Sequence, residues 1–160
     1  MSSFDKIIRK LEETWWRIWG YQIVECLGDL HVKIFRSLND KYWVGARRFR
    51  TVSVQGATDY GVGNPNLKTN ALQIFKNRLK VISKNRTLIL LMGEVDVGFL
   101  AWWRSKRNKM DAMVCMEDTW QKCMRYLIDV KQLHPRLVVC SVPLPTIGDG
   151  ETHRNIANAR

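Results

Sequence analysis

The chain has 160 residues, of which 46% are hydrophobic, and a net charge of +11, a balance that favours one globular domain with a buried core. Its apolar runs are shorter than the roughly 20 residues that cross a bilayer, and its first twenty-one residues lack the unbroken apolar centre of a secretory signal peptide. Four cysteines without Cys-x-x-Cys spacing and three scattered histidines argue against a metal site, and we expect no metal and no cofactor. We also expect the cysteines to be thiols in a reducing intracellular compartment, the cytoplasm foremost, and we do not expect secretion.

The chain begins with a segment whose apolar residues recur at helical spacing, which predicts an amphipathic helix over residues 3–19. Its apolar stripe consists of Phe4, Ile7, Ile8, Leu11, Trp15, Ile18 and Trp19. Aromatic stripes of this kind are common at contact surfaces. The stripe therefore either packs on the domain or contacts another chain or a membrane interface.

After this helix, apolar runs of strand length alternate with helical patterns. We expect strands at 22–27 and 49–54, a helix-like stretch at 31–39 and a glycine-rich loop at 55–66. Further along, we expect a helix at 71–82, a strand at 87–92, a basic connection at 103–109, a helix at 111–130 and a strand at 136–142. The last eleven residues are polar and show no strong period.

This alternation is typical of an α/β fold with an open parallel sheet. Strands that are nearly continuously apolar fit a sheet covered by helices on both faces. We divide the chain into the amphipathic helix at 1–20, an α/β domain at 21–147 and a polar tail at 148–160. Because the carboxyl ends of parallel strands meet at one edge, we expect functional groups to gather there.

Gly28-Asp29-Leu30-His31 follows the first strand and precedes a helix-like run. A strand that ends in a tight turn before a helix exposes its turn residue at the open end of the sheet, where α/β enzymes place a nucleophile. Leu30 carries no atom that could attack an acyl carbon. Asp29 is also a favoured helix N-cap, and His31 could cap or contact a ligand.

Two further segments follow predicted strands. Gly56, in the sequence Gln-Gly-Ala-Thr, can bring its backbone N–H close to a ligand or adopt a positive φ in a turn. Gly93-Glu94-Val95-Asp96 follows the strand at 87–92. Glu94 or Asp96 could hold the loop, contact a polar ligand or cap the next helix.

In order and spacing, these segments resemble the blocks of the SGNH (GDSL-type) hydrolases, which read Gly-Asp-Ser, a glycine, and Gly-x-Asn-Asp. The resemblance implies a three-layer, flavodoxin-like sheet of about four strands, with Leu30 at the nucleophile position and Gly56 as an oxyanion-hole donor. It also implies that the remnants of the active site are Asp29, His31, Gly93, Glu94 and Asp96.

The reactive groups of that family are missing at these positions. Leu30 replaces the serine, and Val95, which has no side-chain donor, replaces the asparagine. The family's final Asp-x-x-His block has no match in register. His153 lies four residues after Asp149, a different spacing, and is the remaining candidate for a general base.

The positive charge is concentrated in residues 41–110, which hold fourteen basic and three acidic side chains. The candidate anion-binding residues are Arg47, Arg48, Arg50, Lys76, Arg78, Lys80, Lys84, Arg86, Arg104, Lys106, Arg107 and Lys109. They form either an ordinary solvated surface or a surface for an anionic partner such as nucleic acid, polyphosphate or acidic lipid.

Three functions remain open from the sequence. The first is a degenerate SGNH-hydrolase-like protein, non-catalytic, that serves as a binding or assembly module with a basic surface for nucleic acid or another polyanion. The alternative is an esterase or acetylhydrolase of that family, if position 30 was altered from serine or the chain is truncated. The third is a membrane-surface protein that uses its first helix. A partner chain or a second copy could cover the tryptophan-rich helix and an exposed edge of the sheet.

Overall fold

The computed structural model describes residues 3–40, 45–61, 69–93 and 95–140. The polar tail predicted at 148–160 lies outside the described residues. None of the described helices is long and apolar enough to cross a membrane.

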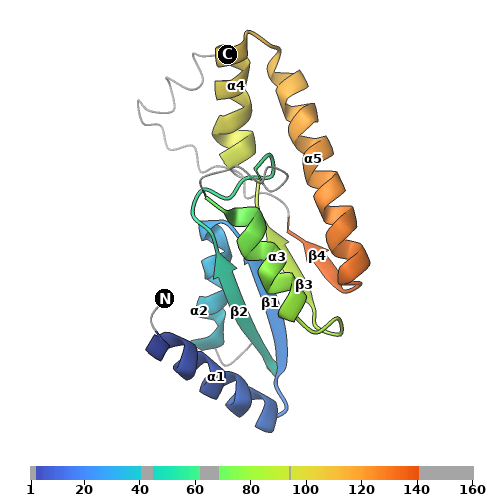
Figure 1. Ribbon diagram of the computed structural model, residues 1–160. Coiled ribbons are helices and arrows are strands. Elements are labelled where there is room, and N and C mark those ends of the chain that lie inside the picture. Colours follow the sequence, from blue (N-terminus) through green and yellow to red (C-terminus); the bar gives the residue numbers. More distant parts are fainter. Residues whose placement is uncertain (1–2, 41–44, 62–68, 94, 141–160) are drawn as a thin grey trace.

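The described residues form an α/β fold around a four-stranded, all-parallel sheet with the order β2-β1-β3-β4 (Figure 1). The strands are β1 (Gln22–Gly28), β2 (Arg47–Ser53), β3 (Leu88–Leu91) and β4 (Leu137–Val139). The five α-helices are α1 (Ser3–Ile18), α2 (Ile34–Ser37), α3 (Ala71–Val81), α4 (Ala101–Asn108) and α5 (Ala112–Leu133). The predicted α/β class and parallel sheet are confirmed, and the strand order is consistent with a flavodoxin-like layout.

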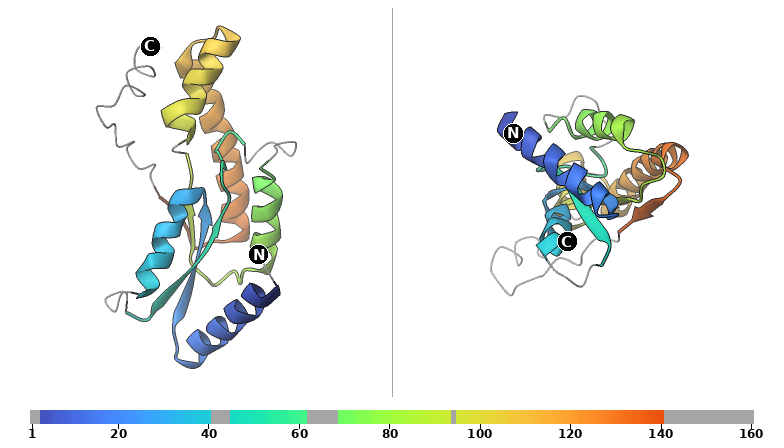
Figure 2. Two further views of the ribbon diagram at one scale, coloured as in Figure 1. Left: turned by 90° about the vertical axis from the view of Figure 1, so that its left-hand side faces the viewer. Right: turned by 90° about the horizontal axis from the view of Figure 1, so that it is seen from below.

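Helices cover both faces of the sheet, with α2 on one side and α3 and α5 on the other (Figure 2). Each face has its own core. Leu27, Leu88 and Leu90 of the sheet pack with Phe75 of α3 and Val130 of α5. On the other face, the core consists of Val24, Cys26, Val32 and Leu91, with Phe35, Phe49, Ile89 and Cys140 packed against it. Alternate residues of one strand thus face opposite cores, as a doubly covered sheet requires.

One predicted element is wrong. The basic segment 103–109, predicted as a connection, belongs to α4, which a π-helical turn (Asp96–Leu100) precedes. Lysine and arginine are good helix formers, and α4 packs against α5 to form a helical hairpin that extends beyond the carboxyl edge of the sheet (Figure 1). Lys109 ends α4 in a left-handed conformation with φ of 53°, and Asp111 caps α5 by accepting the Met113 N–H at 2.6 Å.

The other elements differ from prediction mainly at their ends. β2 begins at Arg47, two residues before the predicted start, because pairing with β1 extends to Gln22. The helix-like stretch after β1 consists of two 3-10 turns (Leu30–Lys33 and Leu38–Asp40) around the short α2. β4 and β2 are the edge strands of the described sheet, and the predicted end of the fourth strand at 142 lies outside the described residues.

Candidate functional site

The turn after β1 lies at the carboxyl edge of the sheet, as the sequence predicted. The Asp29 N–H donates to the Leu91 carbonyl at 3.2 Å, and the Val54 N–H donates to the Gly28 carbonyl at 2.9 Å. The turn is therefore held between the ends of β3 and β2. Leu30 is 41% exposed, so the position that resembles a nucleophile site is open to solvent but presents only hydrocarbon.

Asp29 caps the 3-10 turn that follows it. Its Oδ1 accepts the His31 N–H at 2.9 Å and lies 3.1 Å from His31 Nδ1. Asp29 itself is buried, whereas the His31 side chain is about half exposed. The expected capping role of Asp29 is confirmed, and the His31 ring is engaged by a carboxylate within its own turn.

Gly28 is required because β1 and β3 approach each other closely at this point. A Cβ atom on Gly28 would lie 1.9 Å from the Leu91 carbonyl oxygen. Because this oxygen belongs to the backbone, it cannot move aside as the end of a flexible side chain could. The glycine of the first block thus has a packing role at the base of the turn, independent of any chemistry.

The other two glycines of the predicted site adopt backbone conformations that favour glycine. Gly56 has φ of 71° and Gly93 has φ of 106°. The Ala57 N–H donates to the Val54 carbonyl at 3.1 Å, so Gly56 lies within a tight turn that directly follows β2. This fits the turn interpretation of Gly56, and its role as an oxyanion donor stays a prediction.

Asp96 joins the loop after β3 to the loop after β2. Its two carboxylate oxygens accept the N–H groups of Asp59 at 2.6 Å and Tyr60 at 3.1 Å. Burial raises the pKa of Asp96 to about 6, although these two N–H groups act in the opposite direction. The N-cap of the following helical turn is Val95, so Asp96 holds the loop and does not cap the helix.

Asp59 is a second acidic group at this edge that sequence reasoning missed. Burial raises its pKa, a hydrogen bond from the Cys123 thiol lowers it, and the nearby Asp29 raises it. Burial and the charge of Asp59 in turn raise the pKa of Cys123 to about 12, so this thiol is protonated and unreactive at neutral pH. Asp59 follows a predicted strand, but no motif marked it.

A cavity of about 270 Å³ opens beside these two carboxyl groups. Its lining residues are Asp59, Asp96, Ala101, Met116, Thr119, Trp120 and Cys123. Only Asp96 among them was predicted as a site residue, because apart from Asp59 the rest of the wall comes from α4 and α5, far along the chain. Leu30 does not belong to the described lining, so the nucleophile position and the cavity are separate features of one edge.

Arg104 and Lys122 lie near this cavity and face the ring of Tyr60. The Arg104 guanidinium and the Lys122 ammonium are each 3.9 Å from the centre of that ring. Both also pair with Asp118, at 2.6 Å and 2.9 Å. Their hydrogen bonds outweigh the effect of burial and lower the pKa of Asp118. Arg104, a predicted anion-binding residue, thus already has an acidic partner.

Three other predicted anion-binding residues converge on Glu25, which is fully buried in the middle of β1. Arg86 and Arg78 contact its carboxylate at 2.5 Å and 2.6 Å, and Arg50 Nε lies 4.0 Å from it. Arg50 also pairs with Glu13 of α1. The charges of these arginines are used inside the fold, and the sequence did not predict this because Glu25 stands within an apolar run.

The remaining predicted anion-binding residues are on or near the surface. Arg48 is partly buried, with its guanidinium 3.8 Å from the centre of the Tyr21 ring, and Arg107 lies 4.9 Å from that of Trp103. The exposed basic residues are Arg47, Lys76, Lys80, Lys84, Lys106, Arg107 and Lys109. These exposed residues are the predicted anion-binding residues that remain available to an anionic partner.

Two predicted site residues, Glu94 and His153, lie outside the described residues. Within the described part of the chain, no group of three or more His, Cys, Asp or Glu side chains could hold a metal ion. The cysteines Cys26, Cys115, Cys123 and Cys140 are free thiols.

Comparisons of the chain with protein-family models, curated proteins and solved structures found no match. The features that bear on function are therefore the strand order, the turn at Leu30 and the groups gathered around Asp96.

Proposed function

We propose that this chain is a degenerate SGNH-hydrolase-like protein, a non-catalytic binding or assembly module with a basic surface for an anionic partner. The observation that carries the proposal is the exposed Leu30 side chain at the turn between β1 and the following helical segment. In an α/β hydrolase, such a turn presents the attacking atom, and here it presents hydrocarbon.

The neighbouring groups support a site without acyl chemistry. Asp29 caps its own turn and engages His31, and Asp96 accepts two backbone N–H groups. Val95 provides no side-chain donor for an oxyanion, and the loss of one such donor costs about 10²–10³ in rate in enzymes that rely on it. The polar groups of this edge therefore maintain its shape.

The esterase alternative is tested by hydrolysis of p-nitrophenyl acetate by the unmodified chain, Leu30→Ser and the size control Leu30→Ala. We expect the unmodified chain and Leu30→Ala to give only the buffer rate, because neither supplies a nucleophile. Slow turnover by Leu30→Ser alone would support a hydrolase frame that has lost its reactive atom. Robust turnover by the unmodified chain would contradict the proposal.

The basic surface is tested by the retention of the chain on immobilised polyuridylate at increasing salt. If about four phosphates are contacted, affinity should fall by roughly 50-fold between 50 and 200 mM salt. The double variant Lys80→Glu/Lys84→Glu, whose residues are exposed in the last turn of α3 and before β3, should bind more weakly than Lys106→Glu/Lys109→Glu, whose exposed residues lie near the end of α4. Binding that does not respond to salt would exclude a phosphate-contacting surface.

A further inference from the structure

Helix α1 turns its polar face toward the domain and its apolar face toward solvent. It lies across the amino ends of β1 and β2, outside the layers that cover the sheet (Figure 1). A helix that belongs to a domain core normally does the reverse. The sequence left two roles open for this stripe, packing on the domain or contact with another chain or a membrane interface. The structure does not show the first.

The inward face of α1 is held by charge. Glu13 pairs with Arg50 of β2. Glu12, Glu13 and Trp16 line a cavity of about 370 Å³, whose opposite wall includes Arg48 and Arg50. Glu13 and Trp16 thus face the sheet, where the Glu13–Arg50 ion pair helps to hold α1.

The outward face of α1 is an unbroken apolar stripe, called the α1 stripe below. Its members are exposed by 40–72% and are Ile7, Ile8, Leu11, Trp15, Ile18 and Trp19. The Trp15 and Trp19 rings form a tilted pair with centroids 5.7 Å apart. Six large apolar side chains in one row make a contiguous patch of the kind that marks an interaction surface.

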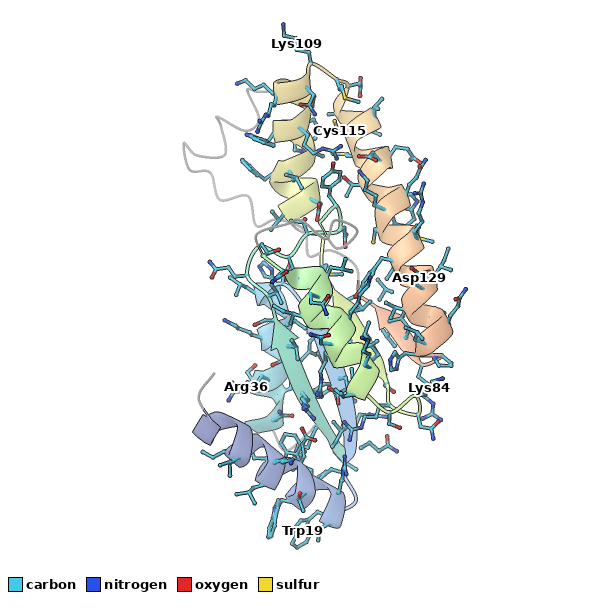
Figure 3. The ribbon with its side chains drawn as sticks, in the orientation of Figure 1. Trp19, Arg36, Lys84, Lys109, Cys115 and Asp129 are labelled. Atoms are coloured by element: carbon cyan, nitrogen blue, oxygen red, sulfur yellow. The ribbon has the colours of Figure 1, made fainter. Side chains whose placement is uncertain are left out.

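Exposed basic residues gather at the same end of the molecule as the α1 stripe. Arg47 begins β2, Lys84 precedes β3 and Arg136 precedes β4, while Lys80 lies in the last turn of α3, the helix that leads to β3. Figure 3 shows Trp19 at the lower tip of the molecule and Lys84 higher, on the right-hand side of its lower half. The apolar α1 stripe and these exposed basic side chains therefore lie in the same half of the molecule.

This combination distinguishes between the occupants that could cover the stripe. A two-fold contact with a second copy would place each basic end against itself, which like charges oppose. Single-stranded nucleic acid would stack its bases on aromatic rings, but four of the six residues are aliphatic. An acidic bilayer accepts both components, because aliphatic and tryptophan side chains enter the boundary between headgroups and acyl chains while basic residues contact the headgroups.

We propose that α1 docks this chain on the surface of an anionic lipid bilayer, with the α1 stripe in the interface and the basic amino end of the sheet on the headgroups. The helix, 16 residues and about 24 Å long, lies in the plane of the membrane between the bilayer and the sheet. This inference rests on the proposed function, since it identifies the anionic partner as an acidic lipid surface.

The test is flotation of the full chain with vesicles of phosphatidylcholine alone or with phosphatidylserine added. The variant Trp15→Gln/Trp19→Gln removes the aromatic part of the stripe, and Phe99→Gln/Trp103→Gln changes two exposed aromatic residues near the opposite end of the molecule. We expect binding to the acidic vesicles that weakens in salt, falls at least about tenfold in the first variant and is retained in the second. Circular dichroism establishes that both variants are folded.

A parallel measurement with polyuridylate separates this inference from the proposed function. If polyuridylate binds and acidic vesicles do not, the lipid inference is wrong and the anionic-partner proposal stands. If neither binds, both are wrong. Equal loss of vesicle binding in the two variants would show that the α1 stripe is not the contact, and a dimer abolished only by Trp15→Gln/Trp19→Gln would assign the stripe to a second copy.

Discussion

Glu25, in the middle of β1, and Asp96, in the helical turn that follows β3, are buried carboxylates in contrasting environments. Arginine side chains from α3 and from the segment before β3 contact Glu25 directly. Asp96 accepts backbone N–H groups, and burial raises its pKa to about 6. Arginine side chains thus compensate the buried charge of Glu25, whereas Asp96 has only backbone N–H donors and burial raises its pKa to about 6.

The two environments differ in what they offer a ligand. A compensated charge such as Glu25 stabilises the fold when all of its partners are present and offers little to a ligand. A buried carboxyl group with a perturbed pKa beside a cavity is typical of binding sites. Asp96 combines two features: its carboxylate holds the loop after β2 through two backbone N–H groups, and it borders the cavity of about 270 Å³.

The largest effect should follow from the loss of the Glu25 carboxylate. In Glu25→Ala, three arginine side chains would face one another without their shared partner, and removing one member of a buried ion pair costs about 3–5 kcal/mol. The measurement is the free energy of unfolding in urea. The control Glu117→Ala removes an exposed carboxylate from α5 and should change stability by less than about 0.5 kcal/mol. If both variants lose the same free energy of unfolding, the arginine contacts of Glu25 do not stabilise the fold more than an exposed carboxylate does.

The next effect is a dependence of stability on pH that Asp96 produces. Its pKa is about 6 in the folded chain and near 4 in an unfolded one, so between pH 4 and 6 the folded state binds more protons. The free energy of unfolding should therefore fall as pH rises through this window, by up to about 3 kcal/mol from this group.

Asp96→Asn, compared at each pH with the unmodified chain, tests this contribution. The variant has no titrating group at position 96, so its stability should depend less steeply on pH between 4 and 6. Asp129→Asn, at an exposed position on α5, should keep the original slope. If the slope of Asp96→Asn matches that of the unmodified chain, another group carries the dependence.

The fold was largely predictable from the sequence because strand and helix signals are local. The apolar run before Gly28 and the helical spacing at 71–82 correspond to β1 and α3. The basic segment 103–109, predicted as a connection, lies in or at the end of α4, since lysine and arginine are good helix formers and Ala101 and its neighbours continue into the helix.

The site was predictable only where a motif marks it. The turn at Gly28–His31 was found because a glycine, a capping residue and the end of a strand coincide. Asp59 and Cys123 were missed, since their proximity results from the packing of α5 against a loop more than sixty residues earlier in the chain. The role of Glu25 was missed for the same reason, because Arg78 and Arg86 are far from it in sequence.

The smallest of these effects tests whether the first glycine of the turn serves packing. In Gly28→Ala, the new methyl group would lie against the Leu91 carbonyl oxygen, so β1 and β3 must separate, at a cost of about 1–3 kcal/mol. Gly98→Ala is the matched control, because a Cβ at Gly98 meets nothing within 4 Å and alanine favours a helix by about 0.5–1 kcal/mol. Opposite signs in the two urea titrations would establish that Gly28 is fixed by the close approach of two strands. If Gly28→Ala leaves the free energy of unfolding unchanged, β1 and β3 can separate at this edge of the sheet. The turn that carries Leu30 would then be too flexible to preserve the geometry of a hydrolase.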